Sequence, residues 1–310
     1  MYQRTTSDIT TQPKNNHFFS PTGYIEFINF NLHNTMSPKD EDELTTGHLP
    51  PNTPQAIGST LRGITTVVMR ELGKDNPTSY ILFSNVPPNI IRPSDDTHIP
   101  GLSSTRITYN SHTKTLVVKL QSPSHQGAEL YLTREIILVT NTVDHSLKRE
   151  LKLLGAATVT HQGISTQPDA SFQTLNLPPG REMKWPSVVV KSGGGRECLD
   201  RLHADARFWI SRSCGQVKAV VVISAERDRE EILFEKFVPD DNLSPPPLRA
   251  ICQQRVVVTR DQGQTVVTGC PLVIAFDEMF LRAAANGVNE HDYVFGQQVL
   301  VEIAEDTWHN

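Results

Sequence analysis

One segment of the sequence, from Trp185 to Ser224, restricts the fold more than any other. It opens with WPSVVVK, an apolar β-branched strand whose proline stands at the entry, where a missing backbone donor does least harm. A glycine turn leads into RECLDRLHADARFWISRS, in which apolar residues recur at helical spacing, and QVKAVVVISAE follows as another strand. This succession of strand, helix and strand favours an α/β fold.

The helix in this segment, residues 196–213, is predicted to be amphipathic. A period of 3.6 residues gives it one face toward the core and one toward solvent. The residues predicted inside are Leu199, Leu202, Ala206, Trp209 and Ile210, and those predicted to face water are Arg201, Asp205 and Arg212. Trp185 and Trp209 are predicted to belong to the core, with stacking on nucleic-acid bases as the alternative.

The sequence on both sides extends this pattern. A second helical stretch begins near residue 124 and carries Leu132, Ile136, Val139 and Val143 on one face. The predicted strands fall at 106–109, 115–120, 155–161, 168–172, 185–191, 216–226 and 230–238. The resulting order, β-β-α-β-β-β-α-β-β, predicts a central mixed sheet flanked by helices.

Changes in composition divide the chain into three predicted parts. Residues 1–102 form a variable, partly disordered N-terminal region, rich in Pro, Thr, Asn and acidic residues, with one amphipathic helix at 59–74. Residues 103–240 form the α/β domain. A proline-rich connector, PDDNLSPPPLRA, then leads into residues 241–310, a C-terminal α+β extension whose apolar residues predict packing on the core.

Charge and cysteine content exclude several classes of protein. The net charge is -5, so no global basic field draws the chain to nucleic acid, and any such site would be a local patch. The four cysteines lack C-x-x-C spacing, no apolar run reaches membrane-spanning length, and the N-terminus lacks the apolar core of a signal peptide. We therefore expect an intracellular protein, cytoplasmic or nuclear, with no membrane partner.

A series of motifs between about Arg106 and Trp308 resembles a known superfamily. In chain order they are SPSHQGAEL, PDASF, WPSVVVK, LHADARFW and CGQVKAVVVIS, followed by VTGCPLVIAFDEMFLR. Together they resemble the PD-(D/E)XK, or restriction-endonuclease-like, superfamily, and more narrowly a group of uncharacterised fungal proteins that contain such a domain. The resemblance implies a restriction-endonuclease-like α/β fold and Mg²⁺-dependent nuclease chemistry.

The resemblance also implies where the catalytic groups should stand. In that superfamily two acids on neighbouring strands hold the metal ion, and a nearby lysine stabilises the charge that develops on the phosphodiester. The first acid falls on Asp169, but the second acid position holds Lys191 and the lysine position holds Gly193. We therefore expect a broken metal site in which the Lys191 ammonium pairs with Asp169 in place of the ion.

Compensation for the lost acid is the alternative. Glu197, at the start of the following helix, could reach back to Asp169 and share a Mg²⁺ ion with it, and Lys218 could serve as a relocated catalytic lysine. Both also have simple structural interpretations, Glu197 as a first-turn helix acid and Lys218 as an exposed strand end. The direction in which Glu129 faces on the first core helix stays open.

The basic residues of this region raise a second question. Arg196, Arg201 and Lys218 are candidate nucleic-acid-binding residues, while a solvated helix face with ion pairs such as Glu197 to Arg201 is the alternative. Two functions follow. One is a catalytically degenerate nuclease-like protein, without a cofactor, that binds DNA, RNA or a protein. The other is an active Mg²⁺-dependent nuclease that hydrolyses phosphodiester bonds with Asp169 and a relocated acid.

Overall fold

The computed structural model describes residues 45–91, 105–121, 123–142, 147–240, 249–286 and 289–309. All of them belong to the compact unit Met36–Asn310. The predictions for residues 1–44 and 92–102 lie outside the described residues, as does Val143 of the predicted first core helix.

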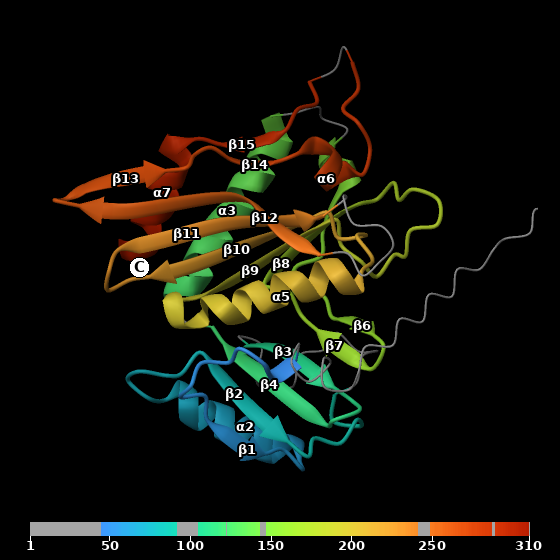
Figure 1. The fold of residues 1–310 in the computed structure, drawn as a ribbon, viewed down its shortest axis with the longest axis vertical. Coiled ribbons are helices and arrows are strands. Elements are labelled where there is room, and N and C mark those ends of the chain that lie inside the picture. The colour runs from blue at the N-terminus through green and yellow to red at the C-terminus, as the bar shows by residue number, and fades with distance from the viewer. Residues whose placement is uncertain are drawn as a thin grey trace, which may run out of the picture. The chain divides into compact units, whose positions relative to one another are not determined.

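A seven-stranded mixed sheet forms the centre of this unit (Figure 1). Its strand order is β13-β12-β11-β10-β9-β8-β5; β9 and β10 are parallel, and all other neighbours are antiparallel. The bounds are β5 Leu151–Leu153, β8 Ala170–Thr174, β9 Val188–Gly194, β10 Ala219–Glu226, β11 Glu231–Pro239, β12 Ala250–Asp261 and β13 Gln264–Thr268. A 3-10 turn at Arg196–Cys198 and helix α5 (Leu199–Arg212) connect β9 to β10.

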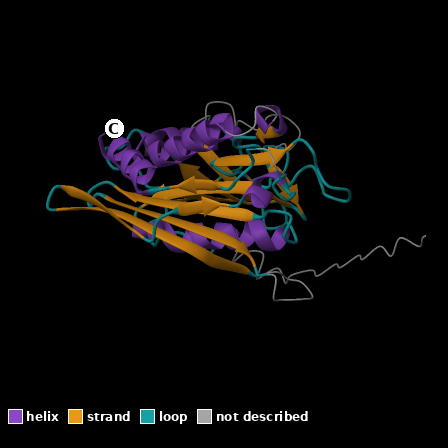
Figure 2. Cartoon of the chain, turned by 90° about the horizontal axis from the view of Figure 1, so that it is seen from above, coloured by secondary structure: helices purple, strands orange, loops and turns teal. Residues whose placement is uncertain are grey.

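Helices cover both faces of this sheet (Figure 2). Helix α3 (Pro123–Thr142) packs on one face and α5 on the other, and the alternation along β9 shows the two sides. Val188 and Val190 pack in one core cluster with Leu132 of α3, whereas Val189 packs in another with Trp209 of α5. A strand buried on both faces must be apolar throughout, which accounts for the β-branched run. The predicted α/β class, with a central mixed sheet flanked by helices, is confirmed.

A second, six-stranded sheet has the order β1-β2-β4-β3-β7-β6. Its strands are β1 Gln55–Ile57, β2 Tyr80–Ser84, β3 Thr105–Asn110, β4 Thr115–Leu120, β6 Val159–His161 and β7 Ile164–Thr166, and helix α2 (Leu61–Leu72) packs on it through Ile64 and Val68. The predicted hairpin at 106–120 exists, but it pairs with β2 and not with the central sheet. The predicted boundary at residue 102 therefore cuts through one sheet.

Helix α5 lies between the seven-stranded sheet and the elements of the six-stranded one (Figure 1). Its predicted core residues Leu202, Ala206, Trp209 and Ile210 are buried, and Leu199 is partly buried. The prediction that Arg201, Asp205 and Arg212 face water is wrong, since all three are buried. The reason is a second covering layer: Arg201 donates to the backbone oxygens of Thr45 and Gly47, and Arg212 donates to Gln162 after β6. The helical period predicts which face of a helix is apolar. It does not predict that a polar face is buried because other parts of the chain cover it.

The C-terminal residues pack on the core as expected. Strands β12 and β13 continue the seven-stranded sheet, so the predicted boundary at residue 240 falls between two paired strands, β11 and β12. The remaining elements are α4 Leu147–Glu150, β14 Leu272–Ile274, α6 Phe276–Phe280, β15 Tyr293–Phe295 and α7 Gln297–His309. Helix α7 packs against α3. No helix in the described part of the chain combines the length and apolarity needed to cross a membrane.

Candidate functional site

Asp169 stands immediately before β8, beside the middle of β9. Its backbone N–H donates to the carbonyl of Val190 at 3.0 Å, and the register pairs Ala170 with Val190. Asp169 and Lys191 therefore lie next to each other on adjacent strands, as the resemblance predicted. The Asp169 side chain has no exposed surface, so its charge must be met by groups of the protein itself.

Four groups surround the Asp169 carboxylate. The Lys119 ammonium lies 2.6 Å from Oδ2, which also accepts the backbone N–H of Ser192 at 2.8 Å. Gln121 donates to Oδ1 at 3.4 Å, and Nε of Arg106 lies 3.8 Å from the same oxygen. Burial by itself would raise the pKa of this carboxyl group, but Lys119 and Lys191 outweigh it and hold the pKa well below its usual range. Asp169 is therefore ionised and neutralised inside the protein.

Lys119, not Lys191, occupies the position expected for a substitute cation. Its ammonium also donates to the carbonyl of Ser192 at 2.5 Å, so it links β4 of the six-stranded sheet to β9 of the seven-stranded one. Lys191 instead pairs with Asp205 of α5 at 3.1 Å and donates to the carbonyl of Gln167, also at 3.1 Å. The expectation of a direct pair between Lys191 and Asp169 is wrong, because the side chain of Lys191 points to the face of the sheet that α5 covers.

Arg201 completes the charge pattern on α5. It lies 3.0 Å from Asp205 in an i,i+4 pair, so Asp205 is held between two cations and its pKa is lowered despite burial. We refer to Arg106, Lys119, Gln121, Asp169, Lys191, Arg201 and Asp205 as the Asp169 cluster. With the exception of Gln121 and Arg106, which are partly exposed, its members are buried.

Glu129, whose direction the sequence left open, faces this cluster. It is buried on α3, and burial together with the neighbouring charge of Asp169 raises its pKa to about 7. Arg106 and Lys119 act in the opposite direction, and the Thr133 hydroxyl donates to its Oε1 at 3.3 Å. A carboxyl group with this pKa changes its charge near neutral pH, whereas the lowered pKa values of Asp169 and Asp205 keep both of those acids ionised there.

The predicted compensating residues lie elsewhere. Glu197 belongs to the exposed 3-10 turn at Arg196–Cys198 and, within the described residues, makes no contact with Asp169. Lys218 directly precedes β10, where Val222 is the partner of Lys191. The four-residue offset corresponds to about 13 Å along the strand at roughly 3.3 Å per residue. Neither residue is brought together with Asp169.

The predicted nucleic-acid-binding residues are also separated from one another. Arg196 is exposed and forms a two-pronged ion pair with Glu231, whose oxygens lie 3.1 and 3.2 Å from Nη2. Arg201 is buried in the Asp169 cluster. Lys218 is exposed at the opposite end of β9 and β10. The buried Trp185 and Trp209 pack edge to face with centroids 6.2 Å apart, which agrees with their predicted core role.

The sequence reasoning missed Lys119, the closest partner of Asp169. The available signal was a lysine inside a β-branched run, TLVVKL, the same signal that singled out Lys191 in WPSVVVK. Lys236 in EILFEKFV repeats it, and that side chain is also buried, paired with Glu278 at 2.9 Å. Interrupted apolar strands in this chain mark buried ion pairs, because a charge inside must have a partner.

The residues around Asp169 do not fit the Mg²⁺ ion that the resemblance implies. One carboxylate oxygen already binds an ammonium and a backbone N–H, and the neighbouring acid position is Lys191. The position two residues further on is closed as well, since a Cβ at Gly193 would lie 3.1 Å from Cδ1 of Leu202. Among the described residues, no group of three or more His, Cys, Asp or Glu side chains is arranged to hold a metal ion.

Comparisons with known proteins show similarity only to solved structures. No protein-family model matches the chain, and no curated protein matches it. Among solved structures, the chain is similar to a crystal structure from Anabaena variabilis described as a "putative nuclease belonging to DUF820". The similarity covers 66% of this chain and 89% of that chain, at 11% identity and a TM-score of 0.29. A likeness this loose marks a nuclease-like neighbour and carries nothing about activity.

Proposed function

We propose that the protein is a nuclease-like protein that is catalytically degenerate at its Asp169 cluster and acts as a binding module. The ion pair between Asp169 and Lys119, at 2.6 Å and out of contact with solvent, supports this most directly. Opening a buried pair on one side is costly, so a metal ion would have to compete with a cation that the chain supplies itself.

A protein partner is favoured over DNA or RNA. Two of the three residues predicted to bind nucleic acid are committed to internal contacts, Arg196 to Glu231 and Arg201 to Asp205. The net charge of -5 adds no long-range attraction for a polyanion. Binding to nucleic acid would then have to rest on a few exposed cations such as Lys218.

The experiment that tests this proposal is a titration with Mg²⁺ and with Mn²⁺, followed by cleavage assays on single- and double-stranded DNA and RNA. We expect no saturable binding of either metal by the unmodified protein and no cleavage. The matched variant is Lys119→Met with Lys191→Glu, which removes the internal cation and restores the second carboxylate. We expect this variant to melt at a higher temperature with Mn²⁺ than without, because an ion that binds only the folded state stabilises it.

Glu129 favours a second candidate, the active Mg²⁺-dependent nuclease with a relocated acid. The charge of Asp169 contributes to the raised pKa of Glu129, so these two carboxyl groups interact electrostatically. Under this alternative the unmodified protein cleaves nucleic acid when metal is added. Cleavage is then lost in Asp169→Asn and in Glu129→Gln but retained in Glu197→Gln. That pattern would replace our first proposal, whereas absence of cleavage in all four proteins supports it.

A further inference from the structure

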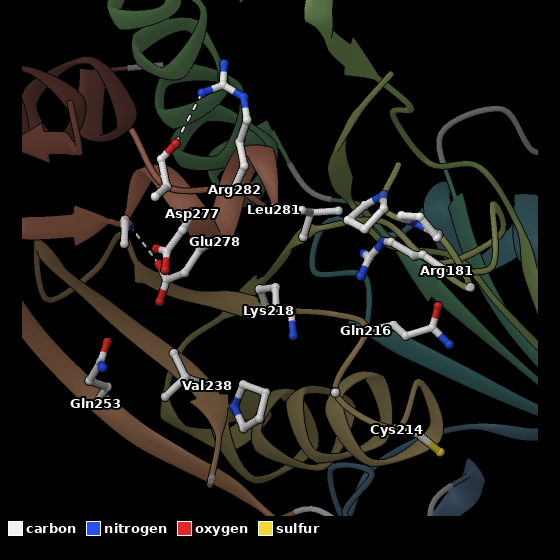
Figure 3. Close-up of a pocket in the computed structure, with 17 residues that line it drawn as sticks. Arg181, Cys214, Gln216, Lys218, Val238, Gln253, Asp277, Glu278, Leu281 and Arg282 are labelled. Atoms are coloured by element: carbon white, nitrogen blue, oxygen red, sulfur yellow. Dashed lines mark hydrogen bonds between the residues drawn. The ribbon is translucent and has the colours of Figure 1, made fainter. Parts of the chain in front are cut away.

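A pocket of about 880 Å³ lies near the end at which β9 and β10 begin, away from the Asp169 cluster. Figure 3 shows the residues that line it. Its walls come from the loop between β8 and β9, the segment before β10, the end of β11 and the region around α6. A volume in this range is typical of sites for small organic molecules. We call it the Arg181 pocket, after the residue that distinguishes it.

Arg181 brings a positive charge to this pocket without an acidic partner. Its Nη2 donates to the carbonyls of Trp185 at 3.3 Å and Pro186 at 3.0 Å, which fixes the guanidinium against the loop. Its Nε has no hydrogen-bond acceptor in the described structure. Burial lowers the pKa of Arg181 to about 10, and no neighbouring carboxylate raises it again. A cation held in this way lacks an anion, since buried charges in proteins are normally paired.

Lys218 brings a second cation. Its side chain is exposed, lines the same pocket, and forms no ion pair with any described residue. In Figure 3 the end groups of Arg181 and Lys218 are directed into the same part of the pocket. The other cations nearby are neutralised: Arg282 binds Glu290 and Glu150, and Lys236 binds Glu278. The pocket therefore holds two positive charges that the protein does not compensate.

The opposite wall restricts the kind of anion that fits. Asp277 is exposed on that wall, and in Figure 3 its carboxylate lies across the pocket from Arg181 and Lys218. A polyanion such as a nucleic-acid strand would meet this charge, while a ligand with one anionic group would not. Two cations match the charge of about -1.5 to -2 that a phosphate monoester carries at neutral pH. Pro179, Val238 and Leu281 offer apolar surface for the remainder of the ligand.

We propose that the Arg181 pocket binds a small phosphate monoester, with the phosphate group between Arg181 and Lys218 and a neutral or cationic remainder toward Asp277. Arg181 supplies a planar guanidinium fixed by the loop, and Lys218 supplies a mobile point charge. This site is independent of the Asp169 cluster and needs no metal ion.

Isothermal titration calorimetry with the full chain tests the proposal. The probes are phosphoserine, adenosine monophosphate and inorganic phosphate; succinate and a short thymidine oligonucleotide are the comparison ligands. We expect saturable binding of a phosphate monoester that is tighter than binding of inorganic phosphate or succinate. Lys218→Met should weaken that binding roughly 10- to 100-fold, the loss typical of one charged hydrogen bond.

Two further variants keep the test decisive. Arg181→Gln should weaken binding by a similar factor, and its melting curve shows whether the loop still folds without the contacts to Trp185 and Pro186. Arg227→Gln removes an exposed arginine at the other end of β10 and should leave the affinity unchanged. Absence of saturable binding by any phosphate monoester at millimolar concentration would overturn the proposal. Binding of succinate as strong as that of the phosphate monoesters would also overturn it. The same holds if the monoesters do not bind and the oligonucleotide binds in a way that Lys218→Met abolishes.

Discussion

Charged groups are arranged in opposite ways at the middle of the parallel pair β9 and β10 and at the end where both strands begin. In the Asp169 cluster both acids are buried and each meets an opposite charge, Asp169 with Lys119 and Asp205 with both Lys191 and Arg201. At the end where both strands begin, Arg181 and Lys218 line a pocket of about 880 Å³ and have no acidic partner among the described residues. The acids of the Asp169 cluster are paired inside the protein, whereas the cations of the Arg181 pocket are not.

This difference separates a structural role from a binding role. A buried charge that is fully paired holds elements together but offers little to a ligand, because any newcomer must displace an internal partner. An unpaired charge that faces a cavity is stabilised directly when a ligand of opposite charge binds, because no internal partner has to be displaced. The resemblance to nucleases predicts a functional site at the Asp169 cluster. The charge pattern instead favours ligand binding at the Arg181 pocket.

The largest effect should follow from Lys119→Met. This change leaves the Asp169 carboxylate buried without its closest cation, and breaking a buried pair on one side costs about 3–5 kcal/mol of unfolding free energy. Urea denaturation followed by tryptophan fluorescence measures the loss. The control is Lys119→Met with Asp169→Asn, which should recover a large part of the stability because no unpaired charge remains.

A loss below about 1 kcal/mol for Lys119→Met would break the comparison. It would mean that water or Arg106 solvates the carboxylate, and the Asp169 cluster would then be accessible to solvent and not fully paired internally. The double variant, Lys119→Met with Asp169→Asn, is the control for the loss of packing contacts of the Lys119 side chain. If both proteins lose the same stability, the lost methylene contacts of Lys119 matter and its charge does not.

Glu129 should make stability depend on pH by up to about 3 kcal/mol, because its pKa is about 7 in the folded protein and near 4.5 in the unfolded chain. Folded Glu129 keeps its proton up to about pH 7, whereas the unfolded residue releases it near 4.5. Its contribution is therefore fully present below pH 4.5 and is lost as the pH rises through 7. Denaturation curves between pH 5 and 8 should show a smaller decrease with rising pH in Glu129→Gln than in the unmodified protein. Equal slopes in both proteins would show that Glu129 is ionised throughout and outside the charge balance of the cluster.

Lys191→Met should cost less than Lys119→Met, about 1–3 kcal/mol. Asp205 retains Arg201 at 3.0 Å, and Asp169 retains Lys119, so neither acid is left without a cation. Only the hydrogen bond to the carbonyl of Gln167 goes unreplaced. Chemical denaturation of the two single variants under identical conditions makes the comparison. A larger loss of stability for Lys191→Met than for Lys119→Met would indicate that Lys191, and not Lys119, is the cation that compensates Asp169.

The sequence predicted α5 and the central strands β8 to β11 well, because these elements depend on local patterns, but three strands predicted for the same sheet, at 106–109, 115–120 and 155–161, lie in the six-stranded sheet. Apolar runs such as VVVK and AVVVIS and the helical spacing of Leu202, Ala206 and Trp209 are properties of neighbouring residues. The position of Asp169 beside Lys191 followed from the resemblance, and the strand pairing confirms it.

The partners of these residues could not be predicted, because they come from distant parts of the chain. Lys119 is 50 residues from Asp169 and stands on the other sheet, and Thr45, which covers Arg201, is 156 residues away from it. No local spacing reports such a contact. The burial of Arg201 and Arg212 was missed for the same reason, since their side of the helix is as polar as a solvated one.

The smallest effect should come from Lys218→Met, within about 0.5 kcal/mol of the unmodified stability. The side chain is exposed and makes no ion pair among the described residues, so nothing in the folded state depends on its charge. The same urea titration used for Lys119→Met gives the comparison, because both variants replace a lysine by a methionine at a strand of this fold. An unchanged stability combined with a 10-fold or greater loss of phosphate-monoester affinity separates binding from folding at this end. A loss of 2 kcal/mol or more would instead indicate a structural ion pair for Lys218, and the Asp169 cluster and the Arg181 pocket would then not differ in kind.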